Sequence, residues 1–225
     1  MWLHINERTV VLASLTCCLR CLSAVSDDPA EWQWAILSMH STLQSAMACH
    51  LTGTADVGAL TQEVIEAMLE WHERDRRGEI ERINLGKDKM GILHTKIVKK
   101  EDYPPSKRLA GPKELFKRLY NPHKRAETAG DILEISNSQR DSFRRLNEFR
   151  HDFTHFTPKG WSIELSGLPD IFLDMLDVLD KISADPWPFR HMEEKEKDQL
   201  KKLLEELRVV LVRLSQQMLT SGGQR

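Results

Sequence analysis

Long apolar runs are missing from the sequence. No stretch comes near the roughly eighteen uncharged, apolar residues that a membrane-spanning helix needs. The most apolar segment, residues 9–26, is interrupted by Arg20, is preceded by Glu7 and is followed by no small-residue cleavage site, so it does not fit a secretory signal peptide. We therefore expect no membrane span and place the protein in the cytoplasm.

Cysteine is scarce, with four residues in 225. Cys18 and Cys21 have the C-x-x-C spacing, but no second such pair and no matching pair of histidines completes a tetrahedral zinc site. Together with Cys17 and Cys49 they fall on a helical pattern, where a free cysteine packs as a small apolar side chain. We expect four packing thiols, as in proteins of a reducing compartment.

An excess of charge is also missing from the chain as a whole, because 32 Lys and Arg face 34 Asp and Glu, a net charge of −2. This balance gives no overall attraction to nucleic acid or to an anionic membrane. Residues 86–125 differ, since they hold twelve Lys and Arg against four acids. Such a segment either binds RNA phosphates or is a solvated basic loop. The candidate RNA contacts are Lys96, Lys99, Lys100, Lys107 and Arg108.

Helical periodicity dominates the rest of the sequence, with apolar residues recurring every three or four positions. The pattern predicts helices over about 11–25, 29–50, 57–77, 112–120, 138–156, 169–184 and 191–217. Residues 161–165 alternate like a strand, but one isolated strand does not make a sheet. The expected fold class is therefore all-α, an antiparallel bundle of six or seven helices.

One domain accounts for this pattern. We expect residues 1–220 to form a single helical domain, in which residues 86–125 are a basic, partly irregular insertion that leaves the bundle and includes a short helix. Residues 221–225 are expected to be a disordered tail.

A polar group stands out near the end of the predicted helix 138–156, where the sequence reads Arg150-His151-Asp152-Phe153-Thr154-His155. On an ideal helix with Phe149 on the buried side, Arg150 lies on the flank, about 100° away. His151 and His155 point away from the core and are neighbours at i and i+4. Core packing therefore does not explain this group.

Three interpretations compete for these residues. The first is a solvated polar face. The second is a metal site, but Asp152 points about 100° away from His151 and no zinc pattern matches, so we expect no metal. The third is a phosphodiester site, in which histidine supplies an acid and a base near neutral pH and arginine holds the phosphate oxygens.

The segment from Arg150 to His155 fits the form R-x4-6-H, with a polar residue directly after the arginine, on a late helix of an all-α bundle. In this it resembles the HEPN superfamily. The resemblance implies a homodimer that brings two motifs together across a cleft, often as a metal-independent endoribonuclease without a cofactor. It implies that Arg150 and His155 do the chemistry and that His151 supports them. Many members are toxins or defence effectors. If this chain is one of them, the sequence does not identify its antitoxin or regulatory partner.

The same spacing occurs at Arg118 and His123, but the context is unsuitable. Leu119 follows the arginine, and Asn121-Pro122 ends the helix between the two residues.

Two polar residues of the second predicted helix, His40 and Gln44, lie on or beside its apolar stripe. A buried polar side chain needs a partner, so His40 is either a satisfied core histidine or faces the Arg150 helix and supports it, with Gln44 nearby.

We expect a protein that acts on RNA, and three alternatives stay open. It is a metal-independent endoribonuclease, a non-catalytic RNA-binding or scaffold protein, or an unrelated helical-bundle interaction protein.

Overall fold

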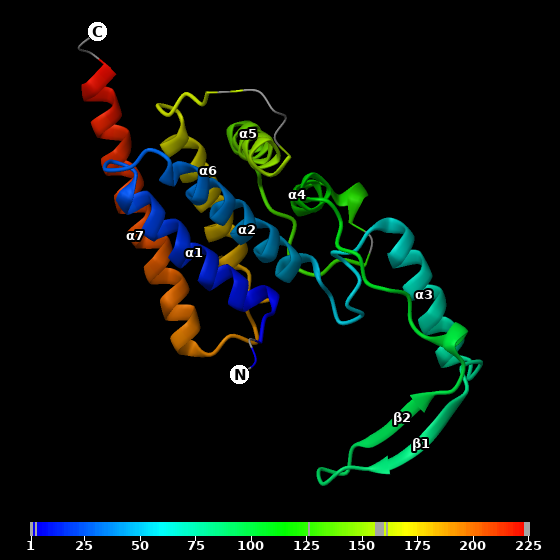
Figure 1. The fold of residues 1–225 in the computed structure, drawn as a ribbon. Coiled ribbons are helices and arrows are strands. Elements are labelled where there is room, and N and C mark those ends of the chain that lie inside the picture. The colour runs from blue at the N-terminus through cyan, green and yellow to red at the C-terminus, as the bar shows by residue number, and fades with distance from the viewer. Residues whose placement is uncertain (1, 3, 126, 156–159, 161, 223–225) are drawn as a thin grey trace.

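The structure is a computed structural model that describes residues 2, 4–125, 127–155, 160 and 162–222. Within this part of the chain, seven α-helices and one two-stranded sheet are present (Figure 1). The helices are α1 Glu7–Ala24, α2 Glu31–Leu51, α3 Gln62–Arg76, α4 Pro112–Tyr120, α5 Asn137–Thr154, α6 Leu168–Ala184 and α7 Glu194–Gly222. The strands are β1 Arg82–Lys87 and β2 Leu93–Ile97, and two short 3-10 turns cover Lys100–Asp102 and Pro122–Lys124. The predicted all-α fold class is confirmed.

Five long helices form the bundle. α1 and α2 pair as the helical hairpin that their short link predicts, α7 lies along α1 and α6, and α5 lies against α2 and α6 (Figure 1). Their buried faces are aliphatic and aromatic, for example Leu15 of α1, Met39 of α2 and Phe172 of α6. Each such side chain contributes roughly 1.5–3 kcal/mol through its removal from water. The bundle therefore holds α2 and α5 in a fixed relation.

A capping box fixes the start of α5. The Ser136 hydroxyl accepts a hydrogen bond from the Gln139 amide at 3.1 Å, and the Gln139 side chain accepts one from the Ser136 amide at 3.1 Å. This arrangement satisfies amides that a helix N-terminus otherwise leaves without partners. Because the first turn is fixed, the polar residues at the far end of the helix also have a defined direction.

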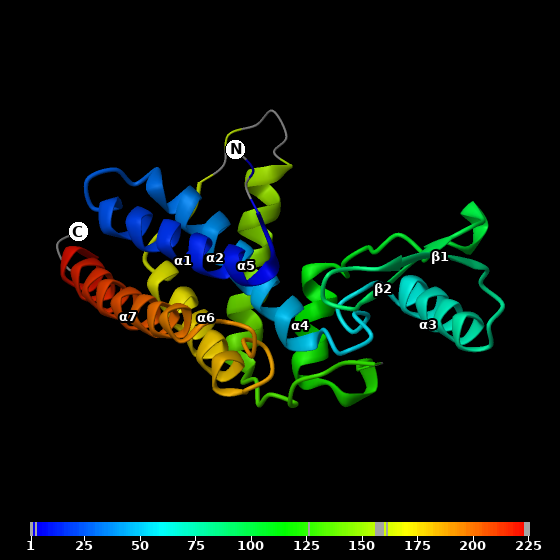
Figure 2. The same cartoon turned by 90° about the horizontal axis from the view of Figure 1, so that it is seen from below.

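A lobe made of α3 and the β-hairpin projects from the bundle, which both Figure 1 and Figure 2 show. It has a small core of its own, built from Val57, Leu60, Ile65 and Met68. α4 returns to the bundle, where the ring of Phe116 stacks on that of Phe143 with 3.9 Å between centroids. We call residues 54–109 the projecting lobe.

Residues 86–125, which were expected to form one basic, partly irregular insertion, therefore belong to two different parts of the structure. The first part is an ordered hairpin in which Arg82 pairs with Ile97 and Lys87 with Leu93, and the last part, α4, belongs to the bundle. The hairpin turns at Asp88, whose carboxylate accepts hydrogen bonds from the amides of Met90 and Ile92. The sequence conceals this hairpin because nearly all of its residues are exposed, so no alternation of buried and exposed positions marks the strands.

Other expectations have mixed outcomes. Residues 162–165, the described part of the strand-like piece, form no strand. α7 continues to Gly222, further than the predicted 217, and the rest of the expected disordered tail lies outside the described residues.

Cys18 and Cys21 are buried and all four cysteines are free thiols, as the packing interpretation predicts. None of the described helices is both long and apolar enough to cross a membrane.

Candidate functional site

His151 and His155 lie side by side at the end of α5. Their ring centroids are 4.9 Å apart with the planes tilted by 45°, and both residues are exposed. The helix ends at Thr154, whose hydroxyl donates a hydrogen bond to the Arg150 carbonyl at 2.9 Å. His155 follows as the C-cap residue, with φ −131° and ψ 43°, so it lies just beyond the helix and not in its last turn. Its amide still donates to the His151 carbonyl at 2.8 Å, which keeps the two imidazoles adjacent.

Arg150 is half-buried in α5, and its positive charge acts on His40 of α2. His40 is only 3% exposed, and its Nε2 donates a hydrogen bond to the side-chain oxygen of Asn147 at 3.3 Å. Burial lowers the pKa of His40 to about 4, and the positive charge of Arg150 acts in the same direction, whereas the hydrogen bond to Asn147 opposes it. His40 is therefore a satisfied, neutral histidine that also faces the Arg150 helix, which combines the two alternatives of the sequence.

Gln44 lies elsewhere. One turn after His40, it lines a cavity of about 670 Å³ between α2, the start of α1 and the loops around Lys107 and Arg190. The structure therefore does not bring Gln44 to Arg150, and of the two candidate residues of the second helix only His40 contacts α5.

The five basic residues expected to contact RNA lie on the projecting lobe, away from α5 (Figures 1 and 2). Lys107 pairs with Asp56 at 3.0 Å, Arg108 with Glu63 at 3.3 Å and Lys99 with Glu81 at 3.9 Å. Lys96 and Lys100 have no ion partner among the described residues. Within one chain these residues and the group from Arg150 to His155 do not share a surface.

A shallow hollow of about 520 Å³ adjoins the end of α5. Apolar side chains from three segments line it, with Trp32 from α2, Phe153 from α5, and Ile163 and Leu165 from the segment before α6. The sequence analysis did not single out this hollow, because the helical period within each segment does not show which segments meet.

The second arginine with the same spacing, Arg118, has a different role. It is 2% exposed, and its Nη1 donates hydrogen bonds to the carbonyl oxygens of Gly58 at 3.0 Å and Leu60 at 2.8 Å. Arg118 thus ties α4 to the base of the projecting lobe, and the sequence-based exclusion of this pair agrees with its burial.

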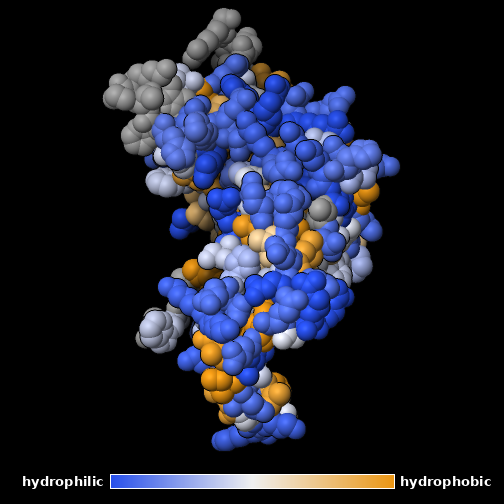
Figure 3. Space-filling model, turned by 90° about the vertical axis from the view of Figure 1, so that its right-hand side faces the viewer, coloured by the Kyte–Doolittle hydropathy of each residue, from blue (hydrophilic) through white to orange (hydrophobic). Residues whose placement is uncertain are grey.

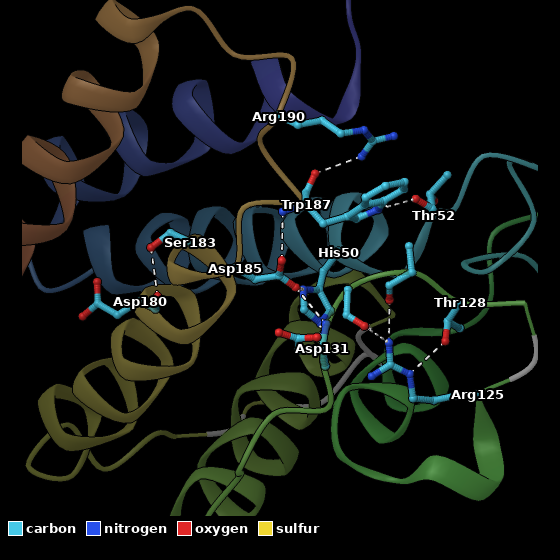
Figure 4. A network of polar contacts seen from close by, with 12 residues as sticks. His50, Thr52, Arg125, Thr128, Asp131, Asp180, Ser183, Asp185, Trp187 and Arg190 are labelled. Carbon is cyan, nitrogen blue, oxygen red and sulfur yellow. Dashed lines mark hydrogen bonds and ion pairs between the residues drawn. The ribbon is translucent and has the colours of Figure 1, made fainter.

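A buried polar joint around His50 escaped sequence analysis (Figure 4). Its Nε2 donates to the Asp131 carbonyl at 2.9 Å, and its Nδ1 is 3.4 Å from the Asp185 carboxylate. Burial lowers the pKa of His50, although the Asp131 carbonyl and Asp185 oppose the shift. Asp185 also accepts from the amides of Asp131 and Trp187, both at 2.8 Å. This joint fastens the end of α2 to the loops before α5 and after α6.

No group of three or more His, Cys, Asp or Glu in the described part of the chain is placed to hold a metal ion. Comparisons of the chain with protein-family models, with curated proteins and with solved structures each found no match. The resemblance to the HEPN superfamily accordingly depends on the motif and on the helical bundle.

Proposed function

We propose that this protein is a HEPN-like, metal-independent endoribonuclease whose site is formed by His151, His155 and Arg150. The observation that carries the proposal is the pair of exposed imidazoles, 4.9 Å apart, at the end of α5. Two adjacent histidines are the groups that cleavage of RNA by its own 2′-hydroxyl needs, because one accepts a proton while the other donates one.

In the proposed reaction, the neutral imidazole of one histidine removes the proton of the 2′-hydroxyl, and that oxygen attacks the neighbouring phosphorus. The bond from phosphorus to the 5′-oxygen breaks, and the protonated second histidine gives its proton to the leaving oxygen. The products are a 2′,3′-cyclic phosphate and a 5′-hydroxyl. An arginine stabilises the extra negative charge of the phosphorane, since its planar fork remains charged and fits phosphate oxygens.

Arg150 of the same chain is half-buried, and its positive charge acts on His40. The proposal therefore uses a homodimer, in which Arg150 of a second copy reaches the phosphate held at the histidine pair. The apolar hollow beside Phe153 would take a nucleobase, because bases pack on aromatic and apolar side chains in single-stranded RNA recognition.

The first experiment incubates the protein with single-stranded and structured RNA in EDTA. We expect cleavage that leaves 2′,3′-cyclic phosphate ends, and a loss of at least about 100-fold in Arg150→Ala, His151→Ala and His155→Ala. Matched controls are Arg144→Ala, an exposed arginine of α5 paired with Asp141, and His94→Ala, an exposed histidine of β2. Cleavage that survives all three site substitutions would contradict the assignment.

A mixing experiment tests the shared site. Arg150→Ala and His155→Ala chains are each inactive alone, but a mixed dimer has one site with an intact arginine and intact histidines. Equal mixing should restore about a quarter of the wild-type activity, because half of the dimers are mixed and each has one working site. No recovery would place Arg150 and His155 in the same chain's site.

The absence of cleavage on every RNA, together with RNA binding that Arg150→Ala weakens, would favour the non-catalytic RNA-binding alternative. If neither cleavage nor binding depends on these residues, the chain is a helical-bundle interaction protein. Arg150, His151 and His155 are then solvated surface residues without a role in RNA binding.

A further inference from the structure

A cavity at the base of the projecting lobe has no part in the proposed reaction. It is the cavity of about 670 Å³ that Gln44 lines, and its size lies within the roughly 300–1,000 Å³ of small-molecule sites. Its walls come from the start of α1, the second half of α2, the base of the lobe and the loop before α7. The hairpin, whose exposed hydrophobic side chains mark the lower end of Figure 3, lies at the far end of the lobe. The cavity therefore lies where the lobe meets the bundle.

Three cations and two acids line this cavity. Lys107 and Asp56 neutralise each other, because their side chains form an ion pair of 3.0 Å. Arg8, Arg190 and Glu7 remain, and none of them has an ion pair within the described part of the chain. With histidine counted as neutral, the cavity keeps one positive charge in excess.

Both arginines are fixed by contacts that leave most of their donors unused. Arg8 donates from Nη1 to the carbonyl oxygen of His191. Arg190 donates from Nη1 to the Trp187 carbonyl at 2.9 Å, and its guanidinium carbon lies 3.8 Å from the centroid of the Trp187 ring (Figure 4). Each hydrogen bond uses only one of the several N–H groups of a guanidinium. Both side chains can therefore donate to a further acceptor without leaving their place.

Cys49 shows that these charges meet inside the cavity. Its half-buried thiol lines the cavity. Burial raises the pKa of Cys49 to about 12 and the charge of Glu7 raises it further, whereas the charges of Arg8 and Arg190 lower it. Because electrostatic effects of this kind fall off with distance, both arginines lie near one point of the wall.

The rest of the wall is partly polar and partly apolar. The side chains of Gln44 and Ser45 are half-buried and make no hydrogen bond within the described residues. They can donate to a ligand, since an amide and a hydroxyl both carry donors. The apolar part consists of Ala48, Ala59, Leu60, Leu109 and Pro188. Such a mixture, a few polar groups beside an apolar wall, is typical of small-molecule sites.

We propose that this cavity binds a small organic acid that has one carboxylate and a partly apolar body. Arg8 and Arg190 hold the carboxylate, because the planar guanidinium fork fits its two oxygens. The apolar part of the wall takes the body of the ligand. One carboxylate neutralises the excess positive charge of the cavity, whereas a doubly charged phosphate monoester would leave an unpaired negative charge. The proposal concerns this cavity alone and does not rest on RNA cleavage.

Titration calorimetry with the full chain tests the ligand class. The probes are 3-phenylpropionate and hexanoate, each compared with its uncharged amide. We expect a Kd of about 0.1–1 mM for the acids and at least about tenfold weaker binding of the amides. No binding of either acid at about 10 mM, or equal binding of acid and amide, would overturn the proposal. Tighter binding of inorganic phosphate or of AMP than of both acids would assign the cavity to phosphates instead.

Substitutions locate the carboxylate. Arg8→Gln and Arg190→Gln should each weaken 3-phenylpropionate binding at least about tenfold. The matched control is Arg213→Gln, at an exposed arginine of α7 that has no ion partner within the described residues, and it should bind as the wild type does. Circular dichroism checks that each variant is folded. Wild-type affinity in both folded cavity variants would contradict the assignment.

Glu7→Gln provides a test that a folding defect cannot mimic. The substitution removes a negative charge from the cavity, so the acid probes should bind about two- to fivefold more tightly while the amides are unaffected. A gain in affinity requires a folded site. Unchanged or weaker binding of the acids by Glu7→Gln would contradict the proposed placement of the carboxylate.

Thiol protection gives an independent measure of where the probe lies. Alkylation of Cys49 by N-ethylmaleimide, followed by mass spectrometry of its peptide, should slow several-fold when 3-phenylpropionate is saturating. Cys17 is the internal control, since it is also half-buried but lies on α1 outside the lining of the cavity, and its rate should not change. Equal protection of both thiols, or of neither, would show that the probe does not occupy this cavity.

Discussion

The Nε2 atom of His40 in α2 lies 3.3 Å from the side-chain oxygen of Asn147 in α5, and this contact joins the bundle core to the candidate site. Asn147 precedes Arg150 by three residues and His151 by four, which puts all three on neighbouring positions of the helix surface. Because Oδ1 only accepts hydrogen bonds, the imidazole donates from Nε2. The buried histidine thus contacts α5 one turn before His151.

The low pKa of His40 makes stability depend on pH. The folded protein has a pKa of about 4 at this group, against 6.5 as its ordinary value. Between these two values the unfolded chain binds a proton that the folded chain does not, so stability falls as the pH falls. Above the ordinary value both states are neutral and the contribution vanishes. From pH 7 to pH 5 the expected loss from this one group is about 2 kcal/mol, measured by urea unfolding.

His40→Gln isolates this contribution, because glutamine can still donate to Asn147 but does not titrate. The variant should lose less stability between pH 7 and pH 5 than the wild type, with His50 supplying part of the remaining slope because its pKa is also lowered by burial. His191→Gln, at an exposed histidine, should leave the wild-type slope. Equal slopes in wild type and His40→Gln would show that His40 is not the titrating group.

Asn147→Asp should raise the pKa of His40, because a carboxylate next to the ring favours the protonated imidazole. The shift is measured from the imidazole proton resonances across a pH titration. Asn147→Ala, which removes the acceptor without adding charge, should move the pKa in the opposite direction, since the hydrogen bond to Asn147 raises it. If both variants moved it the same way, the contact between His40 and Asn147 would not control this titration.

The sequence predicted the bundle and the neighbouring histidines because both follow from helical period alone. Leu15, Met39 and Phe172 mark buried faces that repeat every three or four residues, and the i, i+4 spacing brings His151 to His155. The period also placed Arg150 on the flank of α5. It could not show that the charge of Arg150 acts on His40, since that depends on how α2 and α5 pack against each other.

Long-range contacts explain what the sequence could not give. The hairpin escaped detection because its strands bury no face against the chain. Gln44 could not be separated from His40, because one turn of helix divides a side chain that meets α5 from one that lines a cavity. His50 could not be recognised as part of a polar joint, because its partners Asp131 and Asp185 lie 81 and 135 residues further along the chain.

Gly130→Ala should be strongly destabilising. Gly130 has φ +69°, and an added Cβ would come 2.6 Å from the His50 carbonyl oxygen and 2.7 Å from its Cε1. Backbone strain and overpacking together should cost about 2–5 kcal/mol. Gly78 is a matched control, since its φ is +73° with nothing within 4 Å of a Cβ, so Gly78→Ala should cost only about 1–2 kcal/mol. Similar losses in urea unfolding would mean that the packing against His50 is not tight.

Arg118→Met should destabilise the projecting lobe more than the bundle. The methionine keeps an apolar stem but leaves the carbonyl oxygens of Gly58 and Leu60 without their donor, at a cost of about 3 kcal/mol for a lost hydrogen-bonded charge in a buried place. Hydrogen exchange should therefore speed up in residues 57–76 while α1 and α7 remain protected. Arg144→Met, at an exposed position, should change stability by less than about 0.5 kcal/mol.

Any RNA cleavage per folded molecule should survive Arg118→Met, because this arginine holds the lobe and does not touch the histidine pair. Uniform loss of protection across the bundle, or loss of cleavage in fully folded Arg118→Met, would contradict that purely structural role.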